Sequence, residues 1–306
     1  MAENQIQRIK TISEFHKLRN LPKPEHPLIS VIDYSKIAPT ARRESFSWVY
    51  DFYMISIKRG INGKMIYGQQ QYDFDEGIMF FIAPNQVFRI DANPKPTMKR
   101  SGWMLLIHPD FLWNTPLAKS IRQYDYFDYA THEALFLSDK EEVTIKNLIL
   151  NIQQEYLSNI DQFSQNIIIS QIETLLNYSE RFYQRQFITR KISNHKILAR
   201  LEELLTDYFN SDDLVTKGLP SVQYISETLN VSTSYLSGLL KLLTGQSTQQ
   251  HIHEKLINKA KEKLSTSNLS VSEIAYELGF EHPQSFSKLF KTKTSLSPVE
   301  FRKSFN

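Results

Sequence analysis

The hydrophobic pattern of residues 195–306 contains an internal repeat. Two stretches begin with a serine, a common helix N-cap residue, and continue with apolar residues at matching helical offsets. The matching positions are Ser221, Val222, Ile225 and Leu229 in the first stretch, and Ser270, Val271, Ile274 and Leu278 in the second. Asn230 and Gly279 follow, and both residue types tolerate the left-handed backbone at which helices often stop. The pattern predicts two short helices, each ending in a tight turn.

A second helix is expected after each turn, at about residues 233–243 and 283–291. Pro283 suits the first turn of a helix, where its missing N–H costs nothing. The apolar positions expected to face inward are Leu236, Leu239, Leu240, Leu243, Phe286, Leu289 and Phe290. Two helices joined by a tight turn, with the second presented outward, are typical of a helix-turn-helix unit that places a recognition helix in the DNA major groove.

The outward residues of these helices suit contact with DNA. Glutamine can bridge adenine N6 and N7, lysine can reach guanine or phosphate, and serine can serve either edge. The candidate DNA-contacting residues are Ser234, Tyr235, Ser237, Gly238, Lys241, Pro283, Gln284, Ser285, Ser287, Lys288 and Lys291. The alternative for each single residue is that it is only solvated. Two units in tandem are more specific than one.

A long helix is expected between the two units, at about residues 248–264. It would fix the separation of the two recognition helices. Its lysines, Lys255, Lys259, Lys261 and Lys263, are candidates for phosphate contacts.

Residues 27–111 have a different pattern, with short β-branched and aromatic runs between turn signals. We expect strands at residues 52–58, 78–82, 87–90 and 102–107. Asn62-Gly63 predicts a hairpin that returns through residues 64–67. Strands of this length and spacing indicate a small β-barrel or sandwich.

Residues 141–192 return to a helical period, with two apolar stripes. The stripes are Ile145, Leu148, Ile149, Ile152 and Tyr156, then Ile168, Ile172, Leu175, Leu176, Phe182 and Tyr183. Two interpretations stay open. Both helices pack on the β-region, or one stripe, within residues 166–187, also forms a homodimer seam.

Composition limits the class of protein. The chain has 306 residues, enough for two domains, and a net charge of +3, a mild preference for polyanionic partners. It contains no cysteine, which excludes disulfides and thiolate chemistry. The N-terminus carries no apolar signal segment and no run reaches the length of a membrane span, so we expect a cytoplasmic protein without membrane contact.

Catalytic patterns are missing from the sequence. A metal-dependent cupin enzyme needs several histidines and a glutamate on its strands, whereas the β-region has His108 near its end and no His-x-His. His251 and His253 would face apart on a helix. The sequence has no glycine-rich phosphate loop and no Gly-x-Ser-x-Gly turn. We expect no enzyme, no catalytic residue, no metal site and no cofactor.

The C-terminal pattern resembles the AraC/XylS family of bacterial transcription regulators. The resemblance rests on SVSEIAYELGF at residues 270–280, SFSKLFK at 285–291 and LSPVEFR at 296–302. Further support comes from Tyr235-Leu236-Ser237, from residues 240–245, and from Ala260 and Leu264 in the linking helix. It covers residues 198–305, roughly a third of the chain.

The resemblance implies two helices inserted into successive major-groove segments on one face of the DNA. The family's contacting positions correspond to Ser234, Ser237, Gly238 and Lys241, and to Pro283, Gln284, Ser285 and Lys288. Two residues depart from the family pattern. Ser295 stands where a glycine is usual, so a left-handed turn there would be slightly strained, or the turn would have a different shape. Gly238 offers no side chain, so the first helix is expected mainly to position the protein.

The N-terminal half resembles, more loosely, the cupin-like effector domain of the same family. Gly77 precedes a strand that ends near Pro84, and Phe88 stands where a histidine is expected. One hypothesis places a small-molecule effector inside the barrel, among Phe52, Tyr53, Tyr67, Phe81, Phe88 and Trp103. The other is that these aromatic residues simply fill the barrel.

Together these features predict an α+β multidomain protein. The expected parts are an N-terminal segment (1–26), a cupin-like β-barrel sensor domain (27–115), a helical connector that is the candidate dimerisation region (116–192) and an all-α domain of two helix-turn-helix units joined by a long helix (195–306).

The expected function is sequence-specific regulation of transcription on double-stranded DNA, controlled by a small ligand or by homodimerisation. An activator would also contact RNA polymerase. The alternative is a small-ligand sensor with weak or no DNA output, and a steep salt dependence of duplex binding would separate the two.

Overall fold

The computed structural model describes residues 6–37, 46–59, 66–67, 70–71, 77–90, 101–130, 133–158, 161–189 and 191–304. The chain divides into two compact units, Met1–Gln186 and Phe187–Asn306. The finer division into four parts stays a prediction. No helix in the described ranges is long and apolar enough to cross a membrane.

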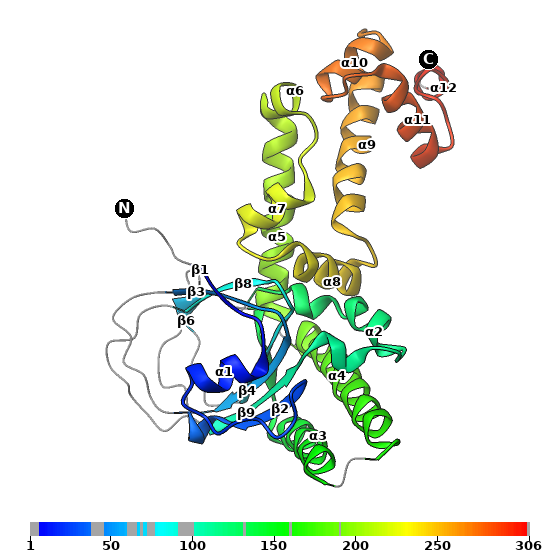
Figure 1. The fold of residues 1–306 in the computed structure, drawn as a ribbon. Helices are drawn as coiled ribbons and strands as arrows, with labels where there is room; N and C mark the ends of the chain where they lie inside the picture. The colour runs from blue at the N-terminus through cyan, green and yellow to red at the C-terminus, as the bar shows by residue number, and fades with distance from the viewer. Residues whose placement is uncertain are drawn as a thin grey trace. The chain divides into compact units, whose positions relative to one another are not determined.

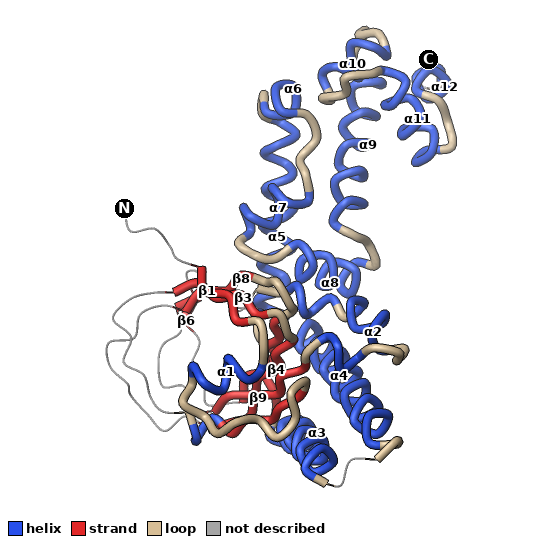
Figure 2. The backbone as a smooth tube through the Cα atoms, viewed as in Figure 1, coloured by secondary structure: helices blue, strands red, loops and turns tan. Residues whose placement is uncertain are grey.

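Unit 1 combines strands with helices (Figures 1 and 2). Its described strands are β1 (Ile6–Ile9), β2 (Ile29–Asp33), β3 (Phe46–Tyr50), β4 (Tyr53–Arg59), β5 (Ile66–Tyr67), β6 (Gln70–Gln71), β7 (Gly77–Ile82), β8 (Val87–Ile90), β9 (Ser101–Ile107) and β10 (Leu135–Leu137). Its described helices are α1 (Ile12–Leu18), α2 (Leu117–Ser120), α3 (Asp139–Leu157) and α4 (Ser164–Thr189), the last of which runs into unit 2, with short 3-10 helices η1 (Tyr34–Lys36), η2 (Pro109–Leu112), η3 (Ile121–Gln123) and η4 (Asp125–Asp128).

The described strands form three separate sheets. A five-stranded antiparallel sheet has the order β10-β7-β4-β9-β2, a three-stranded sheet has the order β1-β3-β8, and β5 pairs with β6. Within these ranges they close no barrel, so a sheet-containing N-terminal unit is what the structure supports. The predicted hairpin pairing of residues 52–58 with 64–67 is wrong, because β7 and β9 occupy both edges of β4. The Asn62-Gly63 turn lies outside the described residues.

Side chains alternate between the two faces along each strand, and both faces of the five-stranded sheet are covered by other elements. One face joins the three-stranded sheet and α1 in an apolar core containing Phe15, Trp48, Tyr50, Phe52, Met54 and Leu106. The other face lies against helices. Val31 N–H donates to the hydroxyl of Tyr156 on α3 (2.9 Å), and the rings of Phe81 and Tyr183 on α4 lie 6.2 Å apart.

The apolar stripes of α3 and α4 are therefore buried inside unit 1. Their buried members include Ile145, Ile149, Ile152, Ile168, Ile172, Leu175 and Leu176. This confirms that the two helices pack on the β-region. The buried side chains are in contact with the unit's own core, and the homodimer seam within residues 166–187 stays a prediction.

Unit 2 is entirely helical across its described residues. Its helices are α5 (Lys191–Asn210), α6 (Asp213–Lys217), α7 (Val222–Leu229), α8 (Thr233–Thr244), α9 (Thr248–Thr266), α10 (Val271–Glu277), α11 (Pro283–Thr294) and α12 (Pro298–Lys303). Helices α5 and α9 run side by side, α8 meets the start of α9, and α10 to α12 gather around its later turns (Figure 1). One apolar core runs through the whole unit, from Leu201 to Phe290.

The turn after α11 tests the expected strain at Ser295. This residue has φ 63° and ψ 0°, the left-handed conformation that serine adopts at a cost. Replacing Ser295 with glycine is expected to raise the free energy of unfolding by about 0.5–1 kcal/mol, after allowing for the greater unfolded-state entropy of glycine. Urea denaturation measures the change.

The matched control is Ser267→Gly at the end of α9, where φ is −128° and any residue is comfortable. That variant also loses the hydrogen bond from Ser267 Oγ to the Lys263 carbonyl (2.7 Å), so it should be less stable than the parent. A Ser295→Gly protein no more stable than the parent would contradict the idea that the turn is strained.

Candidate nucleic-acid interface

The first helix-turn-helix unit is α7 followed by α8. Tyr224 N–H donates to Ser221 Oγ (3.0 Å), which starts α7 as the serine pattern predicts. Asn230 ends it with φ 57° in the left-handed region, and Ser232 then caps α8 through the N–H of Tyr235 (3.1 Å). The predicted stop at Asn230 and the predicted start of the second helix at residue 233 are both confirmed.

The second unit, α10 followed by α11, repeats this construction. Glu273 N–H donates to Ser270 Oγ (3.2 Å), and the Glu273 carboxylate accepts from Ser270 N–H (2.7 Å). This hydrogen bonding from Ser270 holds the pKa of the Glu273 carboxyl below its ordinary value. The Glu273 side chain of the capping box is therefore an ionised carboxylate at neutral pH. Gly279, at φ 77°, makes the turn, and Pro283 opens α11.

Helix α11 divides sharply into a buried and an exposed side. Phe286 and Phe290 are fully buried, and their rings lie 5.8 Å apart. Four residues predicted to contact DNA are exposed on this helix: Gln284, Ser285, Lys288 and Lys291. Pro283 and Ser287 are half-buried. His282 provides no side-chain cap, but its backbone carbonyl accepts a hydrogen bond from Ser285 N–H (3.0 Å).

Helix α8 offers fewer polar groups. Lys241 is exposed, whereas Ser234, Ser237 and Gly238 are half-buried, and Ser237 Oγ lies 3.4 Å from Thr248 Oγ1. Tyr235 is only 8% exposed and packs edge-on against Phe187, with ring centroids 5.1 Å apart. The structure therefore gives Tyr235 a packing role.

The two histidines of α9 are engaged separately. His251 Nε2 pairs with Thr244 Oγ1 (2.9 Å), and His253 Nε2 pairs with Gln249 Nε2 (3.0 Å). Burial lowers the pKa of both rings. Within the described ranges no group of His, Asp and Glu side chains is placed to hold a metal ion.

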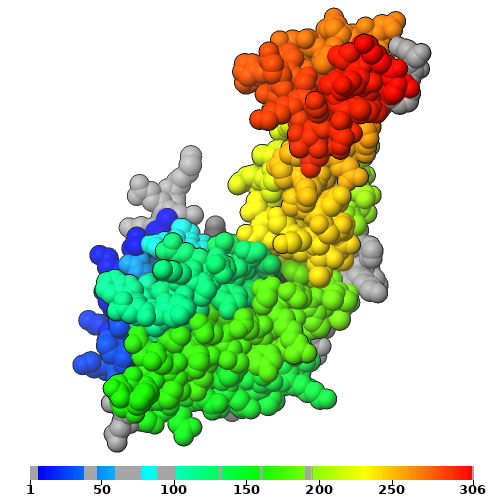
Figure 3. Space-filling model, turned by 90° about the vertical axis from the view of Figure 1, so that its right-hand side faces the viewer, coloured from blue at the N-terminus to red at the C-terminus, as the bar shows by residue number. Residues whose placement is uncertain are grey.

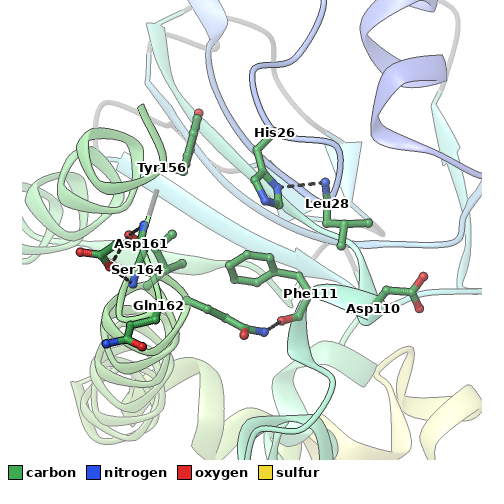
Figure 4. A pocket seen from close by; sticks show the side chains of 10 residues that line it. His26, Leu28, Asp110, Phe111, Tyr156, Asp161, Gln162 and Ser164 are labelled. Carbon is green, nitrogen blue, oxygen red and sulfur yellow. Dashed lines mark hydrogen bonds between the residues drawn. The ribbon is translucent and has the colours of Figure 1, made fainter. Parts of the chain in front are cut away.

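Unit 1 contains a separate concave site of about 340 Å³ (Figure 4). It lies where the start of β2, η2, the end of α3 and the start of α4 meet. Its lining residues are His26, Leu28, Asp110, Phe111, Tyr156, Asp161, Gln162, Ser164, Gln165 and Ile168. The lining residues that the structure describes include two carboxylates and no lysine or arginine, so they favour a neutral or cationic molecule over an anion.

His26 gives this pocket a defined hydrogen-bond donor. Leu28 N–H donates to His26 Nδ1 (3.1 Å), and burial lowers the pKa of the ring. The neutral imidazole consequently carries its proton on Nε2. The ring also meets Phe111 edge-on at 5.5 Å, and Gln165 Nε2 donates to the Phe111 carbonyl (2.8 Å), which fixes this wall of the pocket.

Of the six aromatic residues predicted to line a ligand pocket, the structure describes the side chains of four, and these are divided between different parts of unit 1. Phe52 belongs to the core between the sheets. Tyr53 and Phe81 lie on the opposite, helix-covered face, where both rings contact Phe127. Trp103 is half-buried on β9, and the side chains of Tyr67 and Phe88 lie outside the described part of the structure. Phe52 lies in the bend before β4 and packs in the core between the sheets, whereas Tyr53 begins β4 and contacts Phe127, so the two do not line one cavity.

Two helix-turn-helix units on one apolar core define a helix-turn-helix DNA-binding protein. The family described as "Helix-turn-helix domain" matches residues 225–304. The HTH-type transcriptional regulator YfiF of Bacillus subtilis is 32% identical over 263 residues, which are 83% of this chain and 77% of that protein. The HTH-type transcriptional activator RhaS of Escherichia coli is 24% identical over 256 residues, 83% of this chain and 86% of that protein.

Among solved structures, the C-terminal domain of AraT, a response regulator from Geobacillus stearothermophilus, aligns with 29% identity and a TM-score of 0.32. The alignment covers 35% of this chain and 84% of that one. The chain belongs to the AraC/XylS family of helix-turn-helix transcription regulators.

Proposed function

We propose that this protein regulates transcription by sequence-specific DNA binding, with α11 reading bases in the major groove. The observation that carries the proposal is the division of α11, whose polar residues are exposed while Phe286 and Phe290 anchor it in the core. Gln284 suits adenine N6 and N7, and Lys288 suits guanine O6 and N7.

Helix α8 has a positioning role in this proposal. Gly238 has no side chain, Tyr235 is buried, and Lys241 is exposed. A lysine of this kind neutralises a phosphate without reading sequence. The two helices would occupy successive major-groove segments, α8 setting the register and α11 supplying most of the discrimination.

Fluorescence anisotropy with two duplexes tests the proposal. One is the promoter region of the protein's own gene, and the other is a scrambled duplex of equal length. We expect a preference for the promoter of about 1,000-fold or more, with affinity that falls steeply between two salt concentrations. Equal weak binding to both duplexes would favour the alternative, a sensor module without direct DNA output.

We further propose that unit 1 regulates the protein through a small ligand. The pocket beside His26 supports this, because it combines an aromatic wall, the Nε2–H donor of His26 and the carboxylates of Asp110 and Asp161. Such a lining suits a neutral hydroxylated molecule or an organic cation.

Thermal unfolding of the full chain tests the ligand class with three probes: xylitol, choline and citrate. Xylitol or choline should raise the melting temperature in proportion to the logarithm of its concentration, and citrate should not. His26→Phe keeps an aromatic ring beside Phe111 but removes the donor, so it should weaken the xylitol effect. Stabilisation by citrate alone would contradict the proposed chemistry.

Homodimerisation and contact with RNA polymerase complete the proposal. RhaS is named an activator, and that likeness supports activation here. The exposed apolar side chains of Leu157, Phe163 and Ile167, near the turn between α3 and α4, are the candidate dimer contacts, because the rest of the stripe is buried in the unit's own core. A monomer at micromolar concentration in sedimentation velocity would count against a dimer.

A further inference from the structure

Three lysines of α9 form a row that is turned toward other helices of unit 2. Lys255 Nζ donates to Thr206 Oγ1 (2.8 Å) and Lys259 Nζ to Asn210 Oδ1 (3.1 Å), both on α5. Lys263 Nζ donates to the carboxylate of Glu277 on α10 (2.6 Å). The lysines are spaced four residues apart, so they share one face of the helix. Their ammonium groups are used within the protein, which argues against the predicted phosphate contacts.

A close backbone contact lies at the α10 end of this row. A Cβ atom on Gly279, in the turn of the second helix-turn-helix unit, would overlap the Leu214 carbonyl oxygen of α6 and lie 2.9 Å from Gly218 Cα. The segment that receives Gly279 is itself held, because Tyr208 Oη donates to the Gly218 carbonyl (3.0 Å). The turn of the second helix-turn-helix unit is thereby packed against residues that precede the first helix-turn-helix unit in the sequence.

Within unit 2, these contacts connect the two helix-turn-helix units by more than one path. Helix α9 links them covalently, α5 runs beside α9 and leads into α6, and α6 meets α10. The apolar core continues through all of them without a division. In the space-filling view, the orange and red segment of α10 to α12 sits directly on the yellow and orange segment that precedes it (Figure 3). Because of these contacts, unit 2 resists bending between α8 and α11.

We propose that this clamp, made of Lys255, Lys259, Lys263, their partners and the Gly218–Gly279 contact, sets the spacing of the DNA segments that the protein accepts. The inference rests on the proposed function. One inserted base pair moves the second segment by about 3.4 Å and rotates it by about 35°. A stiff pair of recognition helices cannot follow this shift without breaking contacts, so the clamp acts as a specificity determinant although it touches no base.

The test uses the full chain and a set of duplexes in which 0, 1 or 2 base pairs are added between the segments covered by the two units, mapped first by footprinting. The parent protein should lose about tenfold in affinity for each added base pair. Lys263→Met and Glu277→Gln each break one arm of the clamp, and both should reduce this loss to about threefold. The exchange Lys263→Glu with Glu277→Lys restores the ion pair and should restore the steep profile.

A second pair of variants separates the close contact from backbone strain. Gly279→Ala and Gly245→Ala both place alanine in a left-handed position, with φ 77° and 74°, but only the first meets backbone atoms of another segment. Gly279→Ala should flatten or shift the spacing profile, and Gly245→Ala should leave it unchanged. Melting temperatures of all variants are measured beside the affinities.

The outcomes distinguish the two levels of inference. If the parent protein shows no preference for its promoter over scrambled DNA, the proposed function fails and the clamp proposal falls with it. If the parent is specific and spacing-sensitive but the clamp variants keep an equally steep profile, only the clamp proposal is overturned. A uniform loss of affinity at every spacing would likewise overturn it, because that is the signature of lost stability.

Discussion

Replacing Gln284 and Lys288 together by alanine should lower the affinity for promoter DNA by about 100-fold, because each lost base contact costs about 1–3 kcal/mol. Both side chains are exposed on α11. Their removal leaves Phe286 and Phe290 in the core, so the melting temperature should hardly change. Binding to scrambled DNA should weaken much less, because Gln284 contributes nothing to charge neutralisation.

The measurement is anisotropy on both duplexes at a fixed salt concentration. The matched control replaces Gln154 and Lys146, an exposed glutamine and lysine on α3 of unit 1, and should leave both affinities unchanged. If the double variant on α11 still prefers its promoter as strongly as the parent does, α11 is not the reading helix. The first helix-turn-helix unit, α7 and α8, would then have to distinguish promoter DNA from scrambled DNA.

Replacing Phe290 by alanine should destabilise unit 2 by about 3–5 kcal/mol, a large part of the stability of an ordinary domain. The ring is fully buried and meets Phe286 at 5.8 Å and Phe301 of α12 at 5.4 Å. The cavity left behind would loosen α11 against both neighbours. DNA specificity should be lost although Phe290 faces away from the exposed side of the helix.

Denaturation monitored by circular dichroism gives the stability of this variant, and anisotropy gives its affinity. Tyr276→Ala on α10 is the control within the same helix-turn-helix unit, because that ring is 54% exposed. It should change stability by about 0.5 kcal/mol or less. A Phe290→Ala protein that stays fully stable would mean that the second helix-turn-helix unit is not anchored through the Phe286, Phe290 and Phe301 rings.

The helix-turn-helix units were predictable from the sequence because their signals are local. Ser221 and Ser270 act as caps on residues three positions further along, and the stops at Asn230 and Gly279 depend on the backbone preferences of single residues. The left-handed turn considered at Ser295 depends on the same kind of local preference, and the structure places Ser295 in that conformation. Periodicity likewise identified which side of α11 is buried.

Strand pairing was predicted less well. The runs that became β4, β7, β8 and β9 were recognised, but β4 pairs with β7 and β9 rather than with its neighbour in sequence. The parallel pairing of β1 with β3 and the edge position of β10 carry no local signal at all. Such partners are chosen by contacts between residues far apart in the chain, which no short window contains.

The sequence by itself therefore determined that unit 2 contains two helix-turn-helix units and which residues of α11 are exposed, since capping and helical period act within a few residues. Only the tertiary structure decided that Tyr235 packs on Phe187, that Phe52 and Tyr53 serve different cores, and that the α9 lysines bind protein groups. In each case the side chain is amphipathic or aromatic and suits several environments. Its role depends on the neighbour that the fold brings to it.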